Sequence, residues 1–164
     1  MHKLIVMRHG HAESFAASDR ERVLTARGEA ASRSQAALVA NFFAGSSPAI
    51  YHSPFVRTTQ TAAQLAAALS AVATGAALDC SRFAEPQLLG NNSPQAVLRW
   101  LDQSGIKQAV IISHQPLVSI LLSLLIEGST AAARQYPMSP ASAALLEFEC
   151  AGAGCFNLKA LQHA

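Results

Sequence analysis

The sequence is poor in charged residues, and its charges nearly balance. Only 13% of the 164 residues are charged while 51% are apolar, a composition that excludes an intrinsically disordered chain. The formal net charge of +2 is too small to predict nucleic acid or an anionic membrane surface as a partner. Any anion chemistry must therefore come from a local group of basic residues.

Cysteines are few and long hydrophobic runs are absent. Three cysteines predict no disulfide framework, although Cys150 and Cys155 flank a Gly/Ala turn and are close enough in sequence to pair. The longest apolar stretch, Leu117–Ile126, is far shorter than the ~20 residues of a membrane-spanning helix. Leu4–Met7 is too short for the apolar region of a secretory signal. We therefore expect a cytoplasmic protein with no membrane partner.

Short apolar runs alternate with helix-forming segments along the chain. Strands are expected at Leu4–Met7, Ala49–His52, Ala109–Ile112, Ala143–Glu149 and Phe156–Leu161. Helices are expected at Thr25–Phe43, Arg57–Leu69, Ser93–Gln103 and Pro116–Ile126. Apolar strands that alternate with helices are typical of a mostly parallel sheet covered on both faces. The predicted fold class is α/β, a three-layer α/β/α arrangement in a single domain spanning residues 1–164.

Local signals mark several helix ends. Thr25 and Ser93 are suitable N-caps, and Pro94 suits the first helical position after Ser93. Gly105 and Gly128 are placed to end the helices that precede them.

Basic and imidazole side chains follow three of the expected strands. Arg8 and His9 come after the first strand, Arg57 lies shortly after the second, and His114 follows the third. Because the carboxyl ends of parallel strands meet at one edge of a sheet, these side chains should lie together. Arginine matches phosphate oxygens with a planar fork, and the helix beginning near Arg57 adds free N–H groups. Gly10 would let the backbone approach a bound anion. The cluster predicts a phosphate site.

Four segments resemble those of a known family. They are Met7-Arg8-His9-Gly10, Leu24-Thr25-Ala26-Arg27-Gly28, Ser53-Pro54-Phe55-Val56-Arg57-Thr58-Thr59-Gln60-Thr61 and Ile112-Ser113-His114. Their order and context resemble the histidine phosphatase superfamily, which includes the cofactor-dependent phosphoglycerate mutases and acid phosphatases. The resemblance implies a phosphoglycerate mutase-like fold and a phosphatase that uses no metal and no cofactor.

Within that superfamily the chain resembles the small SixA-type phosphohistidine phosphatases. The stretch between Arg57 and His114 has little room for the long insertions that close over the substrate in phosphoglycerate mutases. The segment Ser113–Val118 also resembles that of the SixA type. The resemblance implies that the substrate is phosphohistidine on a phosphotransfer domain, and that the protein acts in signal transduction.

The resemblance also implies roles for the clustered residues. His9 would be the nucleophile that becomes phosphorylated. Arg8 and Arg57 would clamp the phosphate, and a protonated His114 would be the fourth member of the pocket. The two arginines should oppose protonation of His9 and so keep it nucleophilic.

Two further residues are candidates for the site. In larger family members a glutamate in the region of Glu85 protonates the leaving oxygen, but a solvated loop carboxylate is the alternative for Glu85. Asp79, the other acidic residue between Arg57 and the Ser93 helix, is expected within a strand. Arg22 is a candidate to contact the phosphate or the substrate protein.

Histidine spacing raises a competing hypothesis. His9 and His11 have the His-x-His spacing that suits zinc on a strand, but no third ligand is evident and Arg8 would repel a cation. His52 lies near the pocket in sequence and is expected at the surface. We predict no metal site.

Three functions remain open at this point. The first is a protein phosphohistidine phosphatase, and the second is a phosphatase or mutase acting on a small phosphorylated molecule. The third is a phosphate-binding module without catalysis, which would be expected to lack the nucleophile or a clamp.

Overall fold

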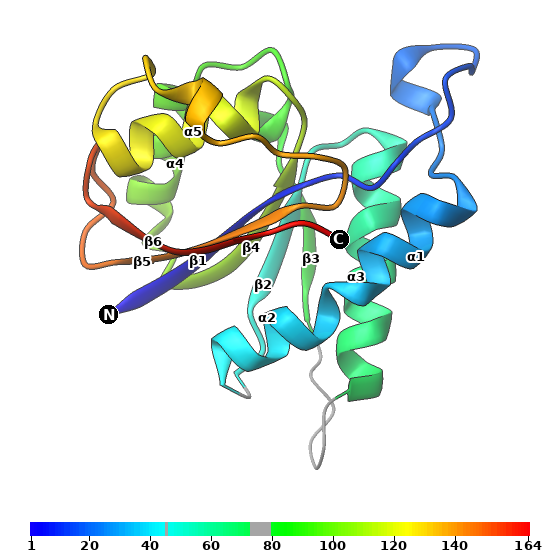
Figure 1. The fold of residues 1–164 in the computed structure, drawn as a ribbon, viewed down its shortest axis with the longest axis horizontal. Helices are drawn as coiled ribbons and strands as arrows, with labels where there is room; N and C mark the ends of the chain where they lie inside the picture. The colour runs from blue at the N-terminus through cyan, green and yellow to red at the C-terminus, as the bar shows by residue number, and fades with distance from the viewer. Residues whose placement is uncertain (45, 73–79) are drawn as a thin grey trace.

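A twisted six-stranded sheet organises the structure, a computed structural model that describes residues 1–44, 46–72 and 80–164. The strands are β1 (His2–Arg8), β2 (Ala49–His52), β3 (Arg82–Ala84), β4 (Gln108–Ser113), β5 (Ala143–Phe148) and β6 (Phe156–Gln162). Their order is β3-β2-β4-β1-β5-β6 (Figure 1). The first four of this order are parallel, β5 is antiparallel to β1, and β6 is antiparallel to β5. The predicted mostly parallel α/β sheet is confirmed; Asp79 lies outside the described residues.

Helices cover both faces of this sheet. They are α1 (Ala26–Ser34), α2 (Ala36–Phe43), α3 (Val56–Val72), α4 (Pro94–Ser104) and α5 (Leu117–Glu127), with short 3-10 turns η1 (Asp19–Glu21), η2 (Pro86–Leu88) and η3 (Ala133–Gln135). Figure 1 shows α1–α3 on one side of the sheet and α4 and α5 on the other. None of the described helices is long and apolar enough to cross a membrane.

Successive side chains of the central strand β1 point alternately into two hydrophobic cores, one on each face of the sheet. Leu4 and Val6 pack in the core that contains α4 and α5. Ile5 and Met7 point the other way, into the core formed with α2 and α3. A strand buried on both faces must be apolar at every position, which is why this run shows no polar alternation. The three-layer prediction is confirmed.

One segment that was predicted to be a single helix forms two helices, α1 and α2. The segment predicted as a single helix, Thr25–Phe43, is interrupted at the buried residue Gln35. No glycine or proline marks the break, so local propensity predicts none. The two halves pack on different partners: Gly28 of α1 lies against the loop after β1, whereas Val39 and Phe43 of α2 enter the core under the sheet.

The predicted helix ends are largely observed. The Thr25 hydroxyl accepts a hydrogen bond from Gly28 N at the start of α1, and the Ser93 hydroxyl accepts one from Ala96 N at the start of α4. Gly105 and Gly128 end α4 and α5 at φ values of +59° and +74°, in the left-handed region that glycine adopts without strain.

Candidate active site

The candidate site lies at the carboxyl ends of the parallel strands. Arg8, the last residue of β1, pairs with Ser113 of β4, and His52 of β2 pairs with Ile112. This register brings the residues that follow each strand to one edge of the sheet. Arg57, in the first turn of α3, reaches the same edge.

His9 is buried at the centre of the site. Its Nδ1 lies 2.7 Å from the carbonyl oxygen of Gly10, which can only accept a hydrogen bond. Nδ1 therefore carries the proton in the neutral ring, and Nε2 keeps its lone pair. The Nε–H of Arg57 donates to that Nε2 over 3.2 Å. The unprotonated nitrogen of His9 therefore faces a cation.

His114 and Arg8 complete the cluster. The imidazole ring of His114 lies 5.1 Å from that of His9, and its Nε2 is 2.7 Å from the Ser53 hydroxyl. Arg8 donates from Nη1 to the carbonyl oxygen of Met138 over 2.9 Å. Arg8 Nε and His114 Nδ1 are buried with no hydrogen-bond partner among the described residues. Buried polar atoms are rarely left unpaired, so two of them beside His9 are expected of a site that takes a polar ligand.

Burial and cationic neighbours lower the basicity of both histidines. Burial, followed by the charges of Arg57, Arg8 and Arg22, lowers the pKa of His9 to about 4, against an opposing contribution from its bond to Gly10. Burial is also the largest cause that lowers the pKa of His114, to about 3. His9 is therefore neutral at pH 7, as expected. The expectation of a protonated His114 is wrong for the ligand-free site, because desolvation and the nearby cations disfavour its charge.

A cavity of about 540 Å³ opens beside this cluster. It is lined by Asp19, Phe55, Arg57, Gly90, Asn91, His114, Gln115 and Pro116. The Phe55 ring forms one wall, where it meets His114 edge-on at 5.2 Å and lies 5.0 Å below the Arg57 guanidinium. The cavity thus has a cationic end and an aromatic side.

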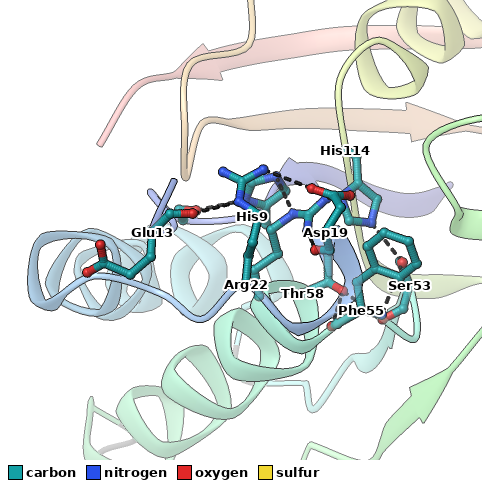
Figure 2. A network of polar contacts seen from close by, with 10 residues as sticks. His9, Glu13, Asp19, Arg22, Ser53, Phe55, Thr58 and His114 are labelled. Carbon is teal, nitrogen blue, oxygen red and sulfur yellow. Dashed lines mark hydrogen bonds and ion pairs between the residues drawn. The ribbon is translucent and has the colours of Figure 1, made fainter. Parts of the chain in front are cut away.

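Asp19 is the residue of this cavity that sequence reasoning missed. Arg57 donates from Nη1 to its carbonyl oxygen over 2.6 Å and from Nη2 to its Oδ2 over 3.1 Å. Arg22 donates from Nη1 to Oδ1 over 2.9 Å. Figure 2 shows the Asp19 side chain among Arg22, His9 and His114. No sequence motif marked Asp19, because it belongs to a polar loop that only the fold brings against α3.

Two further predicted site residues, Arg22 and Glu85, lie outside the cluster of Arg8, His9, Arg57 and His114. Arg22 holds Asp19 and the carbonyl oxygen of Glu13, so it reaches the cavity through Asp19. Glu85 follows β3 at the same edge, but its carboxylate accepts a hydrogen bond from Gln87 N and is not among the residues lining the cavity. The structure does not bring Glu85 into the cluster.

Gly10 has a packing role that the sequence interpretation did not include. Its N–H donates to the Thr61 hydroxyl over 3.0 Å. A Cβ at this position would lie 2.6 Å from the carbonyl oxygen of Gly28, so the missing side chain lets α1 approach. Contact between Gly10 and an anion stays a prediction.

Other motif residues hold the site segments together. Gln60 accepts a hydrogen bond from Leu24 N over 2.7 Å, which joins α3 to the segment before α1. Thr25 N donates to the carbonyl oxygen of His11 over 3.0 Å. The motif positions outside the cluster therefore fix the loops that carry His9 and Asp19.

His11 and His52 make contacts that the sequence did not predict. His11 Nδ1 contacts the Thr25 hydroxyl, and the described residues contain no group of three or more His, Cys, Asp or Glu able to hold a metal ion. His52, expected at the surface, is buried and hydrogen-bonded to the Ser53 carbonyl oxygen, because α3 covers the end of β2.

Similarity to known proteins agrees with this geometry. A family model for the histidine phosphatase superfamily (branch 1) matches residues 4–79. The phosphohistidine phosphatase SixA of Escherichia coli (strain K12) is 33% identical over 162 residues, which cover 94% of this chain and 91% of that protein. The chain belongs to the histidine phosphatase superfamily. The recognised resemblance and the assignment to phosphatases that hydrolyse phosphoric groups are therefore confirmed.

Solved structures of this superfamily share the fold over nearly the whole chain. The protein histidine phosphatase SixA complexed with tungstate superposes with a TM-score of 0.77 at 27% identity, covering 98% of this chain and 96% of that one. A mycobacterial glucosyl-3-phosphoglycerate phosphatase complexed with VO3 gives 0.72 at 15% identity and covers both chains fully. The second likeness concerns the fold alone, so the phosphoglycerate mutase-like fold does not by itself select a substrate.

Proposed function

We propose that this histidine phosphatase removes phosphate from phosphohistidine on a phosphotransfer protein. The observation that carries the proposal is the make-up of the cavity: the guanidinium of Arg57 and the neutral imidazole of His114 line it, but no described residue that lines it is an acid still protonated at neutral pH. Its carboxylate, Asp19, has a lowered pKa, chiefly through its hydrogen bond from Arg22. A phosphate ester needs a proton on its leaving oxygen, whereas imidazole can leave with a proton that it already carries. The relative SixA supports the same substrate.

His9 is the nucleophile in this proposal. Its Nε2 attacks phosphorus in line as the bond from phosphorus to the substrate nitrogen breaks, and the electron pair of that bond stays on the substrate ring. The product is phosphorylated at His9 Nε2, while Nδ1–H keeps its hydrogen bond to Gly10. Water then displaces His9 from phosphorus and releases inorganic phosphate, which restores the neutral ring.

Charge stabilisation comes from the groups around His9. In this proposal Arg57 Nε, which bonds the attacking nitrogen over 3.2 Å before phosphate binds, turns to a phosphoryl oxygen, and Arg8 Nε, which has no hydrogen-bond partner among the described residues, donates to another. His114 Nδ1 is the third candidate donor, once the bound dianion favours its protonated form. The transferring phosphoryl group needs mainly such positioning and positive charge, so the residues present fit the reaction without a metal.

Room for a protein-borne substrate supports the phosphotransfer partner. Between Arg57 and His114, α4 packs through Val97 and Leu101 into the core with α5. Of the described residues in this stretch, only Gly90 and Asn91 of the loop before α4 line the cavity. A histidine on the surface of another protein could therefore enter from solvent. A cytoplasmic phosphorelay in signal transduction is the setting we propose.

A comparison of kcat/KM between substrates tests this function. The enzyme is given a phosphotransfer protein phosphorylated on histidine, and separately phenyl phosphate and a sugar phosphate, and kcat/KM is measured for each. We expect kcat/KM to be highest on the phosphoprotein. A higher value on either ester would replace the proposal with a small-molecule phosphatase.

Glu85 supplies a second arm of the same test. If its carboxylate were the general acid, Glu85→Gln would lower ester hydrolysis by about 10²-fold or more. Since that carboxylate caps η2 outside the cavity, we expect less than about threefold on either substrate class.

A further inference from the structure

Asp19 places a negative charge in a cavity that binds a dianion. Its side chain is 61% exposed while that of its partner Arg57 is only 7% exposed, so the carboxylate is the more exposed partner of this ion pair. Repulsion between this carboxylate and an incoming phosphate opposes binding. A carboxylate at this position therefore requires a compensating function.

Asp19 is not a proton donor. Its two carboxylate oxygens accept one hydrogen bond each, from Arg22 and from Arg57, and both bonds require the ionised form to be strong. A carboxylate has about four lone-pair sites, so further acceptor capacity remains on the exposed side. Within the cavity Asp19 is therefore a charged acceptor for an N–H group.

The orientation of Arg57 separates this acceptor from the nucleophile. Arg57 Nε points to His9 Nε2, whereas Nη1 and Nη2 point to Asp19. A phosphoryl group at His9 thus meets one edge of the guanidinium, and the carboxylate lies beyond the other edge. The Phe55 ring lines the same space and offers a flat apolar wall to a planar leaving group.

We propose that Asp19 determines the choice of leaving group: its carboxylate accepts a hydrogen bond from the protonated imidazole ring of the substrate, and so selects phosphohistidine over phosphate esters. This inference rests on the proposed function and assigns a residue to its specificity. One nitrogen of the phosphorylated ring is bound to phosphorus, and the second carries an N–H only when it is protonated, which makes the ring cationic. An ester leaving group offers neither the N–H nor the positive charge.

The bond changes balance without an enzyme acid. The bond from His9 Nε2 to phosphorus forms while the bond from phosphorus to the ring nitrogen breaks, and its electron pair returns to that nitrogen. The ring loses its positive charge and leaves as neutral imidazole with its N–H still bonded to Asp19. The carboxylate stabilises the cationic ring before this step, which keeps more of the substrate protonated at neutral pH.

The test compares two substrates that differ in the leaving atom. Values of kcat/KM are measured on phosphoimidazole and on phenyl phosphate for wild type, Asp19→Asn and the control Glu21→Gln. Glu21 is in the same 3-10 turn as Asp19, but it bonds Ser18 and does not line the cavity. Asp19→Ser replaces the asparagine variant if that variant does not fold.

We expect Asp19→Asn to lower the ratio of the two kcat/KM values, phosphoimidazole over phenyl phosphate, by about tenfold or more, as loss of a hydrogen bond to a charged group does. On phosphoimidazole, the fall of kcat with rising pH should move to lower pH, since the bound ring loses its proton more easily. Glu21→Gln should change neither measurement.

Two outcomes separate the inference from the function beneath it. If Asp19→Asn lowers kcat/KM equally on both substrates, so that their ratio is unchanged, Asp19 acts through Arg57 alone. The inference is then wrong while the proposed function stands. If wild type itself prefers phenyl phosphate, the proposed function fails and the inference fails with it.

Discussion

His9 lies where burial and neighbouring arginines act in the same direction. Both hold its imidazole in the neutral form, and its bond to Gly10 leaves Nε2 as the unprotonated nitrogen, whose lone pair accepts the hydrogen bond from Arg57. The cations that depress its basicity are also the groups that we propose donate to the phosphoryl oxygens. In this proposal one arrangement prepares both the nucleophile and the charge stabilisation.

Replacement of either clamp tests this arrangement. Arg8→Ala and Arg57→Ala should each lower kcat by about 10²-fold or more, because a preorganised charge donor is lost. Arg8→Lys and Arg57→Lys should restore only part of the activity, since lysine lacks the planar fork. Arg99→Ala, on the exposed side of α4, is the matched control. Full activity in either lysine variant would show that point charge, and not guanidinium geometry, is what the site uses.

At this scale, residue chemistry predicted the cluster but not its surroundings. Arg8, His9, Arg57 and His114 follow strand ends, and the rule for parallel sheets places them together. Asp19 has no such marker, since its position depends on how a polar loop folds back on α3. The charge of His114 was misjudged for a similar reason: desolvation depends on burial, which the sequence pattern does not report.

At the scale of elements, α1 packs directly against the loop after β1 that carries His9. Its residue Gly28 packs against the backbone of His11, two residues after His9, and a Cβ there would overlap the His11 carbonyl oxygen. The start of α1 is held by the same loop through Thr25. Helix and loop thus fix each other.

Gly28→Ala should therefore be destabilising, although alanine is the better helix former. The added methyl group forces α1 away from the loop, at a cost of about 1–3 kcal/mol in unfolding free energy, and kcat should fall as His9 is displaced. Ala30→Ser, at an exposed position of the same helix, is the control. Urea unfolding gives the free energies. A Gly28→Ala protein more stable than wild type would mean that the helix has room at this position.

Element boundaries were predictable where a cap or a stop residue marks them. Thr25, Ser93, Gly105 and Gly128 carry that information locally. The break at Gln35 carries none, since it results from the two helix halves packing on different partners. Tertiary packing overrides helix propensity there.

For the whole molecule, the two buried histidines couple stability to pH. Their pKa values are about 4 for His9 and about 3 for His114, below the 6.5 of an unfolded histidine. Between pH 6.5 and those values the unfolded chain binds more protons than the folded one. The unfolding free energy must therefore fall as the pH falls through this window.

The expected loss between pH 7 and pH 5 is about 2 kcal/mol for each histidine. His9→Gln and His114→Gln should each flatten the pH dependence of the unfolding free energy, whereas Ala30→Ser, which changes no titratable group at an exposed position, should not. Urea unfolding at several pH values measures this pH dependence of the unfolding free energy. An equally steep dependence in the two buried variants would contradict the neutral, buried state of these rings.

The overall architecture was the most predictable feature of the molecule. Continuous apolar strands such as Leu4–Met7 reveal burial on both faces, and their alternation with helices implies parallel pairing. The fold alone does not identify the substrate, because the same architecture occurs in phosphatases that act on different substrates. We propose that this choice depends on the cavity, and above all on Asp19.

The central claim is that phosphate passes through His9. Ser53 is the competing nucleophile, because its hydroxyl lies 2.7 Å from His114 Nε2 in the arrangement of a serine and its base. Enzyme mixed with phosphoimidazole is quenched in alkali within its first turnover, and the phosphorylated peptide is identified by mass spectrometry. The account predicts one acid-labile, alkali-stable phosphoryl group on His9 and no turnover by His9→Ala. An acid-stable phosphoryl group on Ser53, with turnover surviving in His9→Ala, would contradict it.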